Sequence, residues 1–206
     1  MISAGSALDL SWADAHVAAI IDSFYPGARG GKAVAEAIFG DFSPSGKLPV
    51  TFYQGTENLP EFTDYDMSDR TYRYTDKNVL YPFGYGLHYG TIRYENAQIS
   101  CAQCSVRDAV DVSVDVINES SYTIHESVQA YIQHEEADAY EPGYQLKGIQ
   151  TVTLQPKETK RVTISLKARD FAIITQEGEC VVRPGSYRIA IGGQQPDARS
   201  AKTYRK

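Results

Sequence analysis

The hydrophobic pattern of this 206-residue chain changes its period near Tyr89. Before Tyr89, apolar residues recur at helical spacing in two short segments, and a long irregular stretch follows them. After Tyr89, apolar and polar residues alternate, which is typical of strands with one buried face. The change predicts two unequal units of different fold class, residues 1–90 and residues 91–206.

The first helix of the first unit is predicted from Ser11 onward. Ser11 and Asp14 have the spacing of a capping box, and Pro26 ends the pattern. The apolar face of this helix is formed by residues that recur at helical spacing: Ala13, Val17, Ile20, Ile21 and Phe24. We therefore expect one helix of several turns before Pro26.

A second helix and a short strand complete the regular structure predicted for the first unit. The helix begins at Gly30 and stops at Gly40. The strand covers residues 48–52 and lies at a sheet edge, because Pro49 lacks a backbone donor. An α/β sheet usually has about five strands. The first unit is therefore expected to be part of an α/β sandwich, completed by an upstream portion or by a second copy.

Residues 54–89 form a long irregular stretch that is rich in tyrosine. Six tyrosines fall within it: Tyr65, Tyr72, Tyr74, Tyr81, Tyr85 and Tyr89. Such residues can face sugars, because the ring stacks on apolar C–H groups while the hydroxyl forms hydrogen bonds. They can equally fasten a long connection to a core. Composition leaves both interpretations open.

The second unit is predicted to be an all-β sandwich. Alternation is clear in residues 110–116, 128–132, 162–166 and 187–191, and residues 146–154 supply a further strand. Turn-like clusters separate several of these segments. The length of this unit is close to the roughly 100 residues of an immunoglobulin-like domain. We therefore expect an antiparallel, immunoglobulin-like fold.

Composition and charge exclude several classes of partner. The chain is 42% hydrophobic and 22% charged, as in ordinary folded proteins, and its formal net charge is −6. A negative charge argues against nucleic acid and against an anionic membrane surface. No segment approaches the roughly 20 apolar residues of a membrane span. Unless the chain is truncated, the absence of a recognisable signal peptide, together with few cysteines, favours a cytoplasmic location.

Three cysteines and one sequon are the candidate sites of modification. Cys101 and Cys104 form a single C-x-x-C pattern, while Cys180 stands alone. A zinc site needs more ligands than this pattern supplies, so we expect neither a metal nor a cofactor. The cysteines are interpreted as thiols of a reduced compartment. The sequon that begins at Asn118 is a pattern that is common by chance.

Two groups of carboxylates are candidates for acid–base chemistry. They are Glu135 and Glu136 beside His134, and Glu61, Asp64, Asp66 and Asp69 in the irregular stretch. A catalytic pair requires one carboxyl group whose pKa is raised in a dry pocket. The sequence gives no sign of such a pocket. We therefore interpret both groups as solvated loop charge.

Five motifs lie between residues 6 and 87. They are Ser-Ala-Leu-Asp-Leu-Ser-Trp at 6–12, Tyr-Pro-Gly-Ala-Arg-Gly-Gly at 25–31, Phe-Gly-Asp-Phe-Ser-Pro-Ser-Gly-Lys-Leu-Pro at 39–49, Arg-Thr-Tyr-Arg-Tyr at 70–74 and Leu-Tyr-Pro-Phe-Gly-Tyr-Gly-Leu at 80–87. Together they resemble the C-terminal region of glycoside hydrolase family 3, the β-glucosidase and β-xylosidase family. The motifs occur in the family's order. The remainder resembles the fibronectin type III-like domain that follows in many members.

The resemblance implies the end of an α/β sandwich domain followed by a fibronectin-like sandwich, both belonging to a retaining β-glycosidase. In the family, an Asp nucleophile comes from an upstream barrel and a Glu acid/base from the earlier part of the α/β sandwich. No residue of this chain matches either motif. The resemblance therefore implies β-glycosides as substrates of the parent enzyme, and an isolated chain without catalytic residues that is inactive on its own.

Arg70, Tyr72, Arg73 and Tyr74 are the candidates for a role near the substrate, because Arg offers a rigid fork of donors and Tyr both stacks and donates. They can alternatively pack the interface between the two units. Two other classes of function remain open. One is a non-catalytic module that binds carbohydrate or protein. The other is a self-associating domain whose copies exchange elements, which unpaired strand edges and uncovered apolar faces favour.

Overall fold

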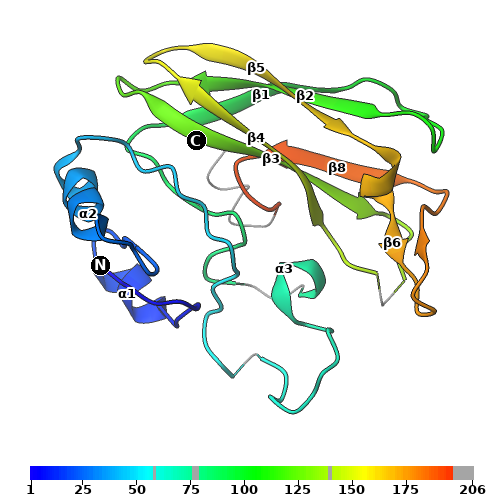
Figure 1. Ribbon diagram of the computed structural model, residues 1–206, viewed down its shortest axis with the longest axis horizontal. Helices are drawn as coiled ribbons and strands as arrows, with labels where there is room; N and C mark the ends of the chain where they lie inside the picture. Colours follow the sequence, from blue (N-terminus) through cyan, green and yellow to red (C-terminus); the bar gives the residue numbers. More distant parts are fainter. Residues whose placement is uncertain (58, 76–78, 139–140, 197–206) are drawn as a thin grey trace.

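A computed structural model describes residues 1–57, 59–75, 79–138 and 141–196 (Figure 1). The second unit is a sandwich of two antiparallel three-stranded sheets, with strand orders β1-β2-β5 and β4-β3-β8. The strands are β1 (Ile92–Ile99), β2 (Val110–Asn118), β3 (Ile124–His134), β4 (Gln145–Leu154), β5 (Thr159–Leu166) and β8 (Tyr187–Gly192). The predicted all-β sandwich is confirmed.

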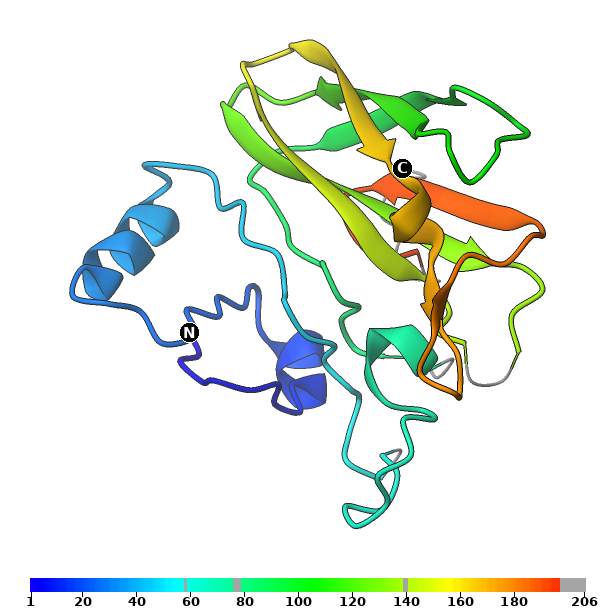
Figure 2. The ribbon, with the colours of Figure 1, turned by 45° about the vertical axis from the view of Figure 1, so that its right-hand side comes forward.

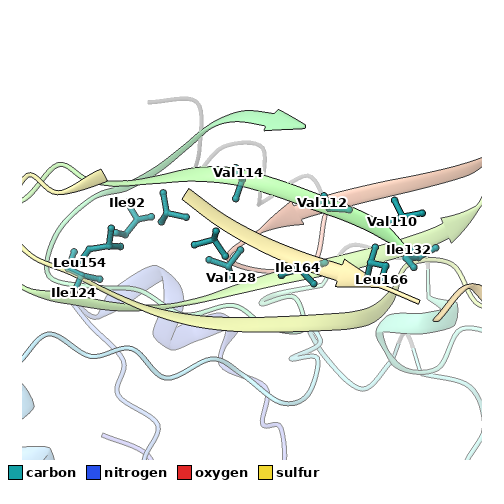
Figure 3. Close-up of a cluster of buried hydrophobic side chains, with 13 residues drawn as sticks. Ile92, Val110, Val112, Val114, Ile124, Val128, Ile132, Leu154, Ile164 and Leu166 are labelled. Carbon is teal, nitrogen blue, oxygen red and sulfur yellow. The ribbon is translucent and has the colours of Figure 1, made fainter. Parts of the chain in front are cut away.

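The core of the sandwich is formed by the inward-facing residues of both sheets (Figure 3). On β2 the residues with even numbers are buried, from Val110 at 5% exposure to Val116 at 0%. They lie opposite β5 in a continuous antiparallel register that runs from the Val110–Leu166 pair to the Ile117–Thr159 pair. Because β-branched side chains pack well on a pleated surface, this alternation gives one dry face.

Some strands could not be predicted from the hydrophobic pattern of the sequence. In β1 only Ile92 is buried, and residues 95–99 of this strand are exposed. The short pair β6 (Ile173–Ile174) and β7 (Cys180–Val181) follows the 3₁₀ helix η1 (Ala168–Phe171). Elements this short, or this exposed, cannot show a period-two pattern.

The first predicted helix is much shorter than expected. α1 covers only Ser11–His16, and residue Val17 is already extended. The backbone that follows pairs with the N-terminal segment, since the Ile2 amide donates to the Ile21 carbonyl at 2.8 Å. β-Branched residues favour this extended pairing over a helix. The capping box is also wrong: Leu10 is the N-cap, and the Ser11 hydroxyl donates instead to the Gln54 carbonyl at 2.8 Å.

The second helix is confirmed as α2 (Gly30–Phe39), which ends at Gly40 in a left-handed conformation with φ 81°. Residues 48–52 do not form the predicted strand, because the backbone bends at Pro49 and Val50. Their backbone makes separate hydrogen bonds with residues 80–85, including one from the Leu48 amide to the Tyr85 carbonyl at 2.8 Å. Only the Phe52–Tyr81 pair forms an isolated bridge, because Pro49 interrupts the run of donors.

The core of the first unit is small, with four buried residues: Leu10, Phe52, Leu80 and Tyr81. Large apolar side chains remain exposed on and around its helices, including Trp12 at 69% and Phe39 at 83%. A hollow of about 420 Å³ lies beside α2, and Val34, Ile38 and Phe39 are among the residues that line it. Figure 2 shows α1 and α2 set apart from the sandwich, with extended segments running between them.

The third helix, α3 (Thr71–Tyr74), lies in the irregular stretch of residues 54–89. It is located beside the sheet that contains β3 (Figure 1). No helix within the described ranges is long and apolar enough to cross a membrane.

Candidate functional site

The junction between the two units is the site on which most of the predicted residues converge. Tyr72 of α3 stacks on Phe83 of the irregular stretch, with ring centroids 4.1 Å apart. The Tyr72 ring also makes an edge-to-face contact with the Tyr131 ring of β3, with ring centroids 6.5 Å apart. The Leu146 amide of β4 donates to the Tyr72 hydroxyl at 3.4 Å, and the Gln195 side chain donates to the Tyr72 carbonyl at 2.9 Å. Tyr72 therefore fastens α3 to the outer face of the β4-β3-β8 sheet.

Arg73 makes a second set of contacts across the same junction. Its guanidinium donates to Gln145 Oε1 at 2.7 Å, and its carbonyl accepts from the Gly143 amide at 2.7 Å. The guanidinium carbon also lies 5.9 Å from the centre of the Tyr74 ring, within the range of a cation–π contact. Arg73 therefore joins α3 to the start of β4.

Arg70 braces the loop that precedes α3. Its Nε donates to the Asp66 carbonyl at 3.0 Å, and Nη2 donates to the carbonyls of Glu61 and Asp64 at 2.9 and 2.6 Å. The braced loop presents the Phe62 and Tyr65 side chains to solvent, at 93% and 91% exposure. Arg70, Tyr72 and Arg73 thus make hydrogen bonds or ring contacts within the chain, while their nearness to a substrate stays a prediction.

The glycines of the 80–87 motif allow close approach at this junction. Gly84 has φ +77°, and a side chain there would meet Gln129 Oε1 and Tyr131 Oη of β3. Gln129 also donates to the carbonyls of Gly84 and Gly193 at 3.3 and 2.9 Å. At Gly86 a side chain would overlap the carbonyl of Gly46. Gly84 is therefore required by close packing against side chains of β3, and Gly86 by close packing against the Gly46 backbone within the first unit.

A buried cluster of charges lies at the same junction. Glu126 of β3 is 1% exposed; its Oε1 lies 3.0 Å from Lys47 Nζ and its Oε2 lies 2.5 Å from His88 Nε2. The Tyr94 hydroxyl of β1 donates to Oε1 at 2.8 Å. Burial by itself raises the pKa of Glu126, but the contact with His88, the Lys47 charge and the Tyr94 hydroxyl outweigh it. The pKa of Glu126 is therefore lowered.

Glu126 is a functional residue that was not predicted, although the sequence contains a signal for it. Glu126 occupies an inward phase of the β3 alternation, between Ile124 and Val128, where an apolar residue is expected. A carboxylate at such a position must have cationic partners, since an unpaired buried charge is costly. Those partners, Lys47 and His88, lie far away along the chain and cannot be identified from spacing.

The first group of weighed carboxylates does not form a catalytic pair. His134 is buried and its Nδ1 lies 3.1 Å from Glu141 Oε2, while Arg183 contacts the other Glu141 oxygen. Glu135 is exposed and forms an ion pair with Arg188 at 2.6 Å. These side chains stabilise one end of the sandwich.

The second group caps turns in the braced loop. The Asp64 carboxylate accepts the Asp66 amide at 2.9 Å, and the Asp66 carboxylate accepts the Ser68 amide at 2.7 Å. The Ser68 side chain and backbone amide both donate hydrogen bonds to the Asp66 carboxylate, and these bonds lower the pKa of Asp66. Each of these two carboxylates therefore has a structural explanation as a turn residue.

The interpretation of the cysteine pair as free thiols is wrong. Cys101 and Cys104 form a disulfide in the loop between β1 and β2, and Cys180 is free and exposed. The C-x-x-C spacing brings the two sulfurs together across one tight turn. A disulfide persists best in an oxidising compartment. The disulfide therefore removes the cysteine argument for a cytoplasmic location, and this location stays a prediction.

The sequon has a structural role. Asn118 is 0% exposed, and its amide donates to the carbonyls of Tyr122, Leu154 and Gln155. Its Oδ1 accepts from the Ser120 amide at 2.9 Å and from the Ser120 hydroxyl at 2.7 Å. A side chain this engaged at the end of β2 is not accessible for glycosylation in the folded chain.

Comparison with known families agrees with this architecture. Residues 1–89 match the glycosyl hydrolase family 3 C-terminal domain, and residues 126–195 match the fibronectin type III-like domain. The fold thus defines a two-part region in which an α/β segment is fastened to a fibronectin-like sandwich. The chain belongs to glycoside hydrolase family 3, whose C-terminal region it represents.

Curated relatives support the same assignment. A beta-xylosidase of Formosa agariphila is 34% identical over 193 residues, which is 91% of this chain and 27% of the relative. A periplasmic beta-glucosidase of Salmonella typhimurium is 32% identical over 200 residues, covering 91% of this chain and 26% of the relative. The chain therefore spans about a quarter of the length of these relatives.

Solved structures show the same arrangement of the two units. A β-glucosidase of Erythrobacter marinus superposes with a TM-score of 0.81 at 34% identity, covering 94% of this chain and 26% of that protein. A β-glucosidase of Listeria innocua in complex with isofagomine gives a TM-score of 0.79 at 26% identity, covering 93% and 28%.

Proposed function

We propose that this chain acts as the C-terminal part of a retaining β-glycosidase that hydrolyses terminal, non-reducing β-D-glycosyl residues of the β-glucoside type. The observation that carries the proposal is the match of more than nine-tenths of the chain to proteins named β-xylosidase and β-glucosidase. The required partners are then an N-terminal barrel and the upstream α/β portion, in the same polypeptide or in another.

The geometry of the chain supports a non-catalytic role for it within that enzyme. Retaining hydrolysis needs two carboxyl groups about 5–5.5 Å apart, one of which has a raised pKa to act as the acid. Glu126 is the most buried carboxylate among the described residues, and its pKa is lowered by its cationic neighbours. The pKa of the exposed Asp66 and of the partly buried Asp115 is lowered as well. These groups are suited to structural ion pairs and turns.

For the predicted substrate-proximal residues we propose an indirect contribution. Arg70 braces the loop that exposes Phe62 and Tyr65, and Tyr72 and Arg73 fix α3 to the sandwich. In the complete enzyme these residues would shape a wall beside the sugar site. Aromatic rings on a braced loop are suited to contact a pyranose face.

The activity of the isolated chain tests the first part of the proposal. The purified chain is incubated with p-nitrophenyl β-D-glucoside and with the corresponding β-D-xyloside, and release of nitrophenol is followed. We expect no turnover above that of a mock purification. Turnover that remains with the chain through successive purification steps would show that it carries its own catalytic carboxylates.

The apolar surface beside α2 favours a second candidate, in which two copies of the chain associate. The hollow beside α2 and the exposed side chains of Ile38 and Phe39 form an uncovered apolar face. Light scattering across a concentration series distinguishes the two candidates. A dimer that Phe39→Ser abolishes would favour self-association, and a monomer at all concentrations would exclude it.

A further inference from the structure

Lys47, His88, Tyr94 and Glu126 form a group that we call the junction cluster. We propose that the junction cluster is an acid-sensitive contact between the two units. It holds the first unit against the sandwich while Glu126 is ionised, and it releases the first unit when Glu126 is protonated. This inference concerns the conformation of the chain and does not depend on its catalytic role.

The cluster joins three separate segments through one carboxylate. Lys47 comes from the turn that follows α2, and His88 comes from the connection before β1. Both therefore belong to the first unit, whereas Glu126 on β3 belongs to the sandwich. Tyr94 on β1 adds a hydrogen bond from the other sheet, at 2.8 Å. One charged group thus receives contacts from both units and from both sheets.

The surroundings of the cluster exclude water. Exposed fractions of the side chains are 1% for Glu126, 9% for His88 and 13% for Lys47. Lys47 Nζ also donates to the Gly86 carbonyl at 3.4 Å. The Lys47 ammonium group therefore lies against the irregular stretch that joins the two units. In such a site a cation that loses its carboxylate partner stays buried without compensation, and this is strongly unfavourable.

Within the described parts of the chain, Glu126 is the acidic side chain that lies within 4.0 Å of both Lys47 and His88. The titratable groups that face Glu126 are Lys47 from the turn, His88 from the connection and Tyr94 from β1. On the neighbouring strand β4, the residue opposite Glu126 is the apolar Val152. Neutralising Glu126 therefore removes the negative charge that the junction cluster presents to Lys47 and His88.

The sign of the pH dependence follows from the pKa of Glu126. Burial raises this pKa, but the contacts of the cluster outweigh burial and lower it from the ordinary value of 4.5. A carboxyl group whose pKa is depressed by folding stabilises the folded form above its ordinary pKa. That contribution is lost as the pH falls through the lowered value. The two units are accordingly expected to separate at acid pH, before the sandwich itself unfolds.

Hydrogen exchange at two backbone amides tests the proposal directly. The Gly143 amide donates to the Arg73 carbonyl at 2.7 Å, and the Gln195 amide donates to the Phe83 carbonyl at 3.1 Å, so both report on the junction. Glu126→Gln keeps the shape of the side chain and removes its charge. At neutral pH we expect these two amides to exchange about tenfold faster in the variant, with amides of β2 and β5 unchanged.

The matched control is Asp115→Asn, which neutralises a partly buried carboxylate of β2 that is bound to Asn96 and Arg161. It should leave exchange at Gly143 and Gln195 unchanged. Unchanged exchange at these amides in Glu126→Gln, or equal acceleration in all strands, would overturn the proposal. If Glu126→Gln does not fold, the wild-type chain is followed from pH 6 downward. Earlier loss of protection at the two junction amides supports the proposal, and simultaneous loss everywhere contradicts it.

Discussion

Gly84 lies where two independent requirements favour glycine over other residues. Its φ of +77° is in the left-handed region, and the place of a side chain is already taken by Gln129 and Tyr131 of β3. Left-handed backbone at a non-glycine residue costs about 1–2 kcal/mol. Overpacking of a well-filled site costs about 1–3 kcal/mol more. The position therefore combines backbone strain with close packing between the units.

Gly84→Ala is expected to lower the free energy of unfolding by about 2–5 kcal/mol, because both costs apply. Gly178→Ala is the matched control, since Gly178 has φ +83° and nothing within 4 Å of the added carbon. The control should lose about 1 kcal/mol, from the backbone alone. Urea denaturation measures both variants. Equal losses would show that close packing at Gly84 contributes nothing.

Asn118 is the second residue whose environment fixes its identity. Three carbonyls accept from its amide group, and its own Oδ1 accepts from Ser120. Asn118→Ala leaves these buried groups without partners, so we expect a loss of about 2–4 kcal/mol in unfolding free energy. Ser121→Ala, at an exposed neighbouring position, should change stability little. A neutral result for Asn118→Ala in thermal unfolding would refute this account of the sequon.

At the scale of elements, the loop before α3 is held by one arginine rather than by regular structure. Arg70 donates to the carbonyls of Glu61, Asp64 and Asp66, and these bonds fix the backbone that carries Phe62 and Tyr65. A planar guanidinium can satisfy three carbonyls at once, whereas a lysine ammonium on a flexible stem holds them less rigidly. The rigidity of this loop should therefore depend on Arg70.

Arg70→Lys is expected to speed cleavage by chymotrypsin at Phe62 and Tyr65 several-fold, while the free energy of unfolding stays within about 1 kcal/mol of the parent value. Arg188→Lys, in an exposed ion pair with Glu135, provides the control and should leave the cleavage rate unchanged. Equal cleavage of the Arg70 variant and the parent chain would mean that the loop is held by other contacts.

Elements with strong periodicity were predictable from the sequence, and elements that depend on distant partners were not. The alternation of β2 fixed its buried face, and Gly40 marked the end of α2. The first helix was predicted too long because its apolar spacing also suits an extended segment, and the pairing with Ile2 decided between them. Glu126 lies just before the predicted alternation of residues 128–132, and its partners Lys47 and His88 are brought to it only by the tertiary fold.

At the scale of the whole molecule, the two units are unequal in completeness. The sandwich has a continuous core of buried residues from both sheets. The first unit has a small core and leaves Trp12, Tyr25 and Phe39 exposed. Large apolar surfaces of this kind mark contacts with other polypeptide. This imbalance is what a C-terminal quarter of a larger β-glycosidase would show.

A chimera tests the central claim most directly. In it, this chain replaces the matching C-terminal region of the Salmonella typhimurium periplasmic beta-glucosidase, to which it is 32% identical. Hydrolysis of p-nitrophenyl β-D-glucoside is then compared among the chimera, the truncated relative and the isolated chain. We predict activity in the chimera and none in either part alone. A chimera that folds, as judged by circular dichroism and a cooperative melt, yet shows no turnover would contradict the account.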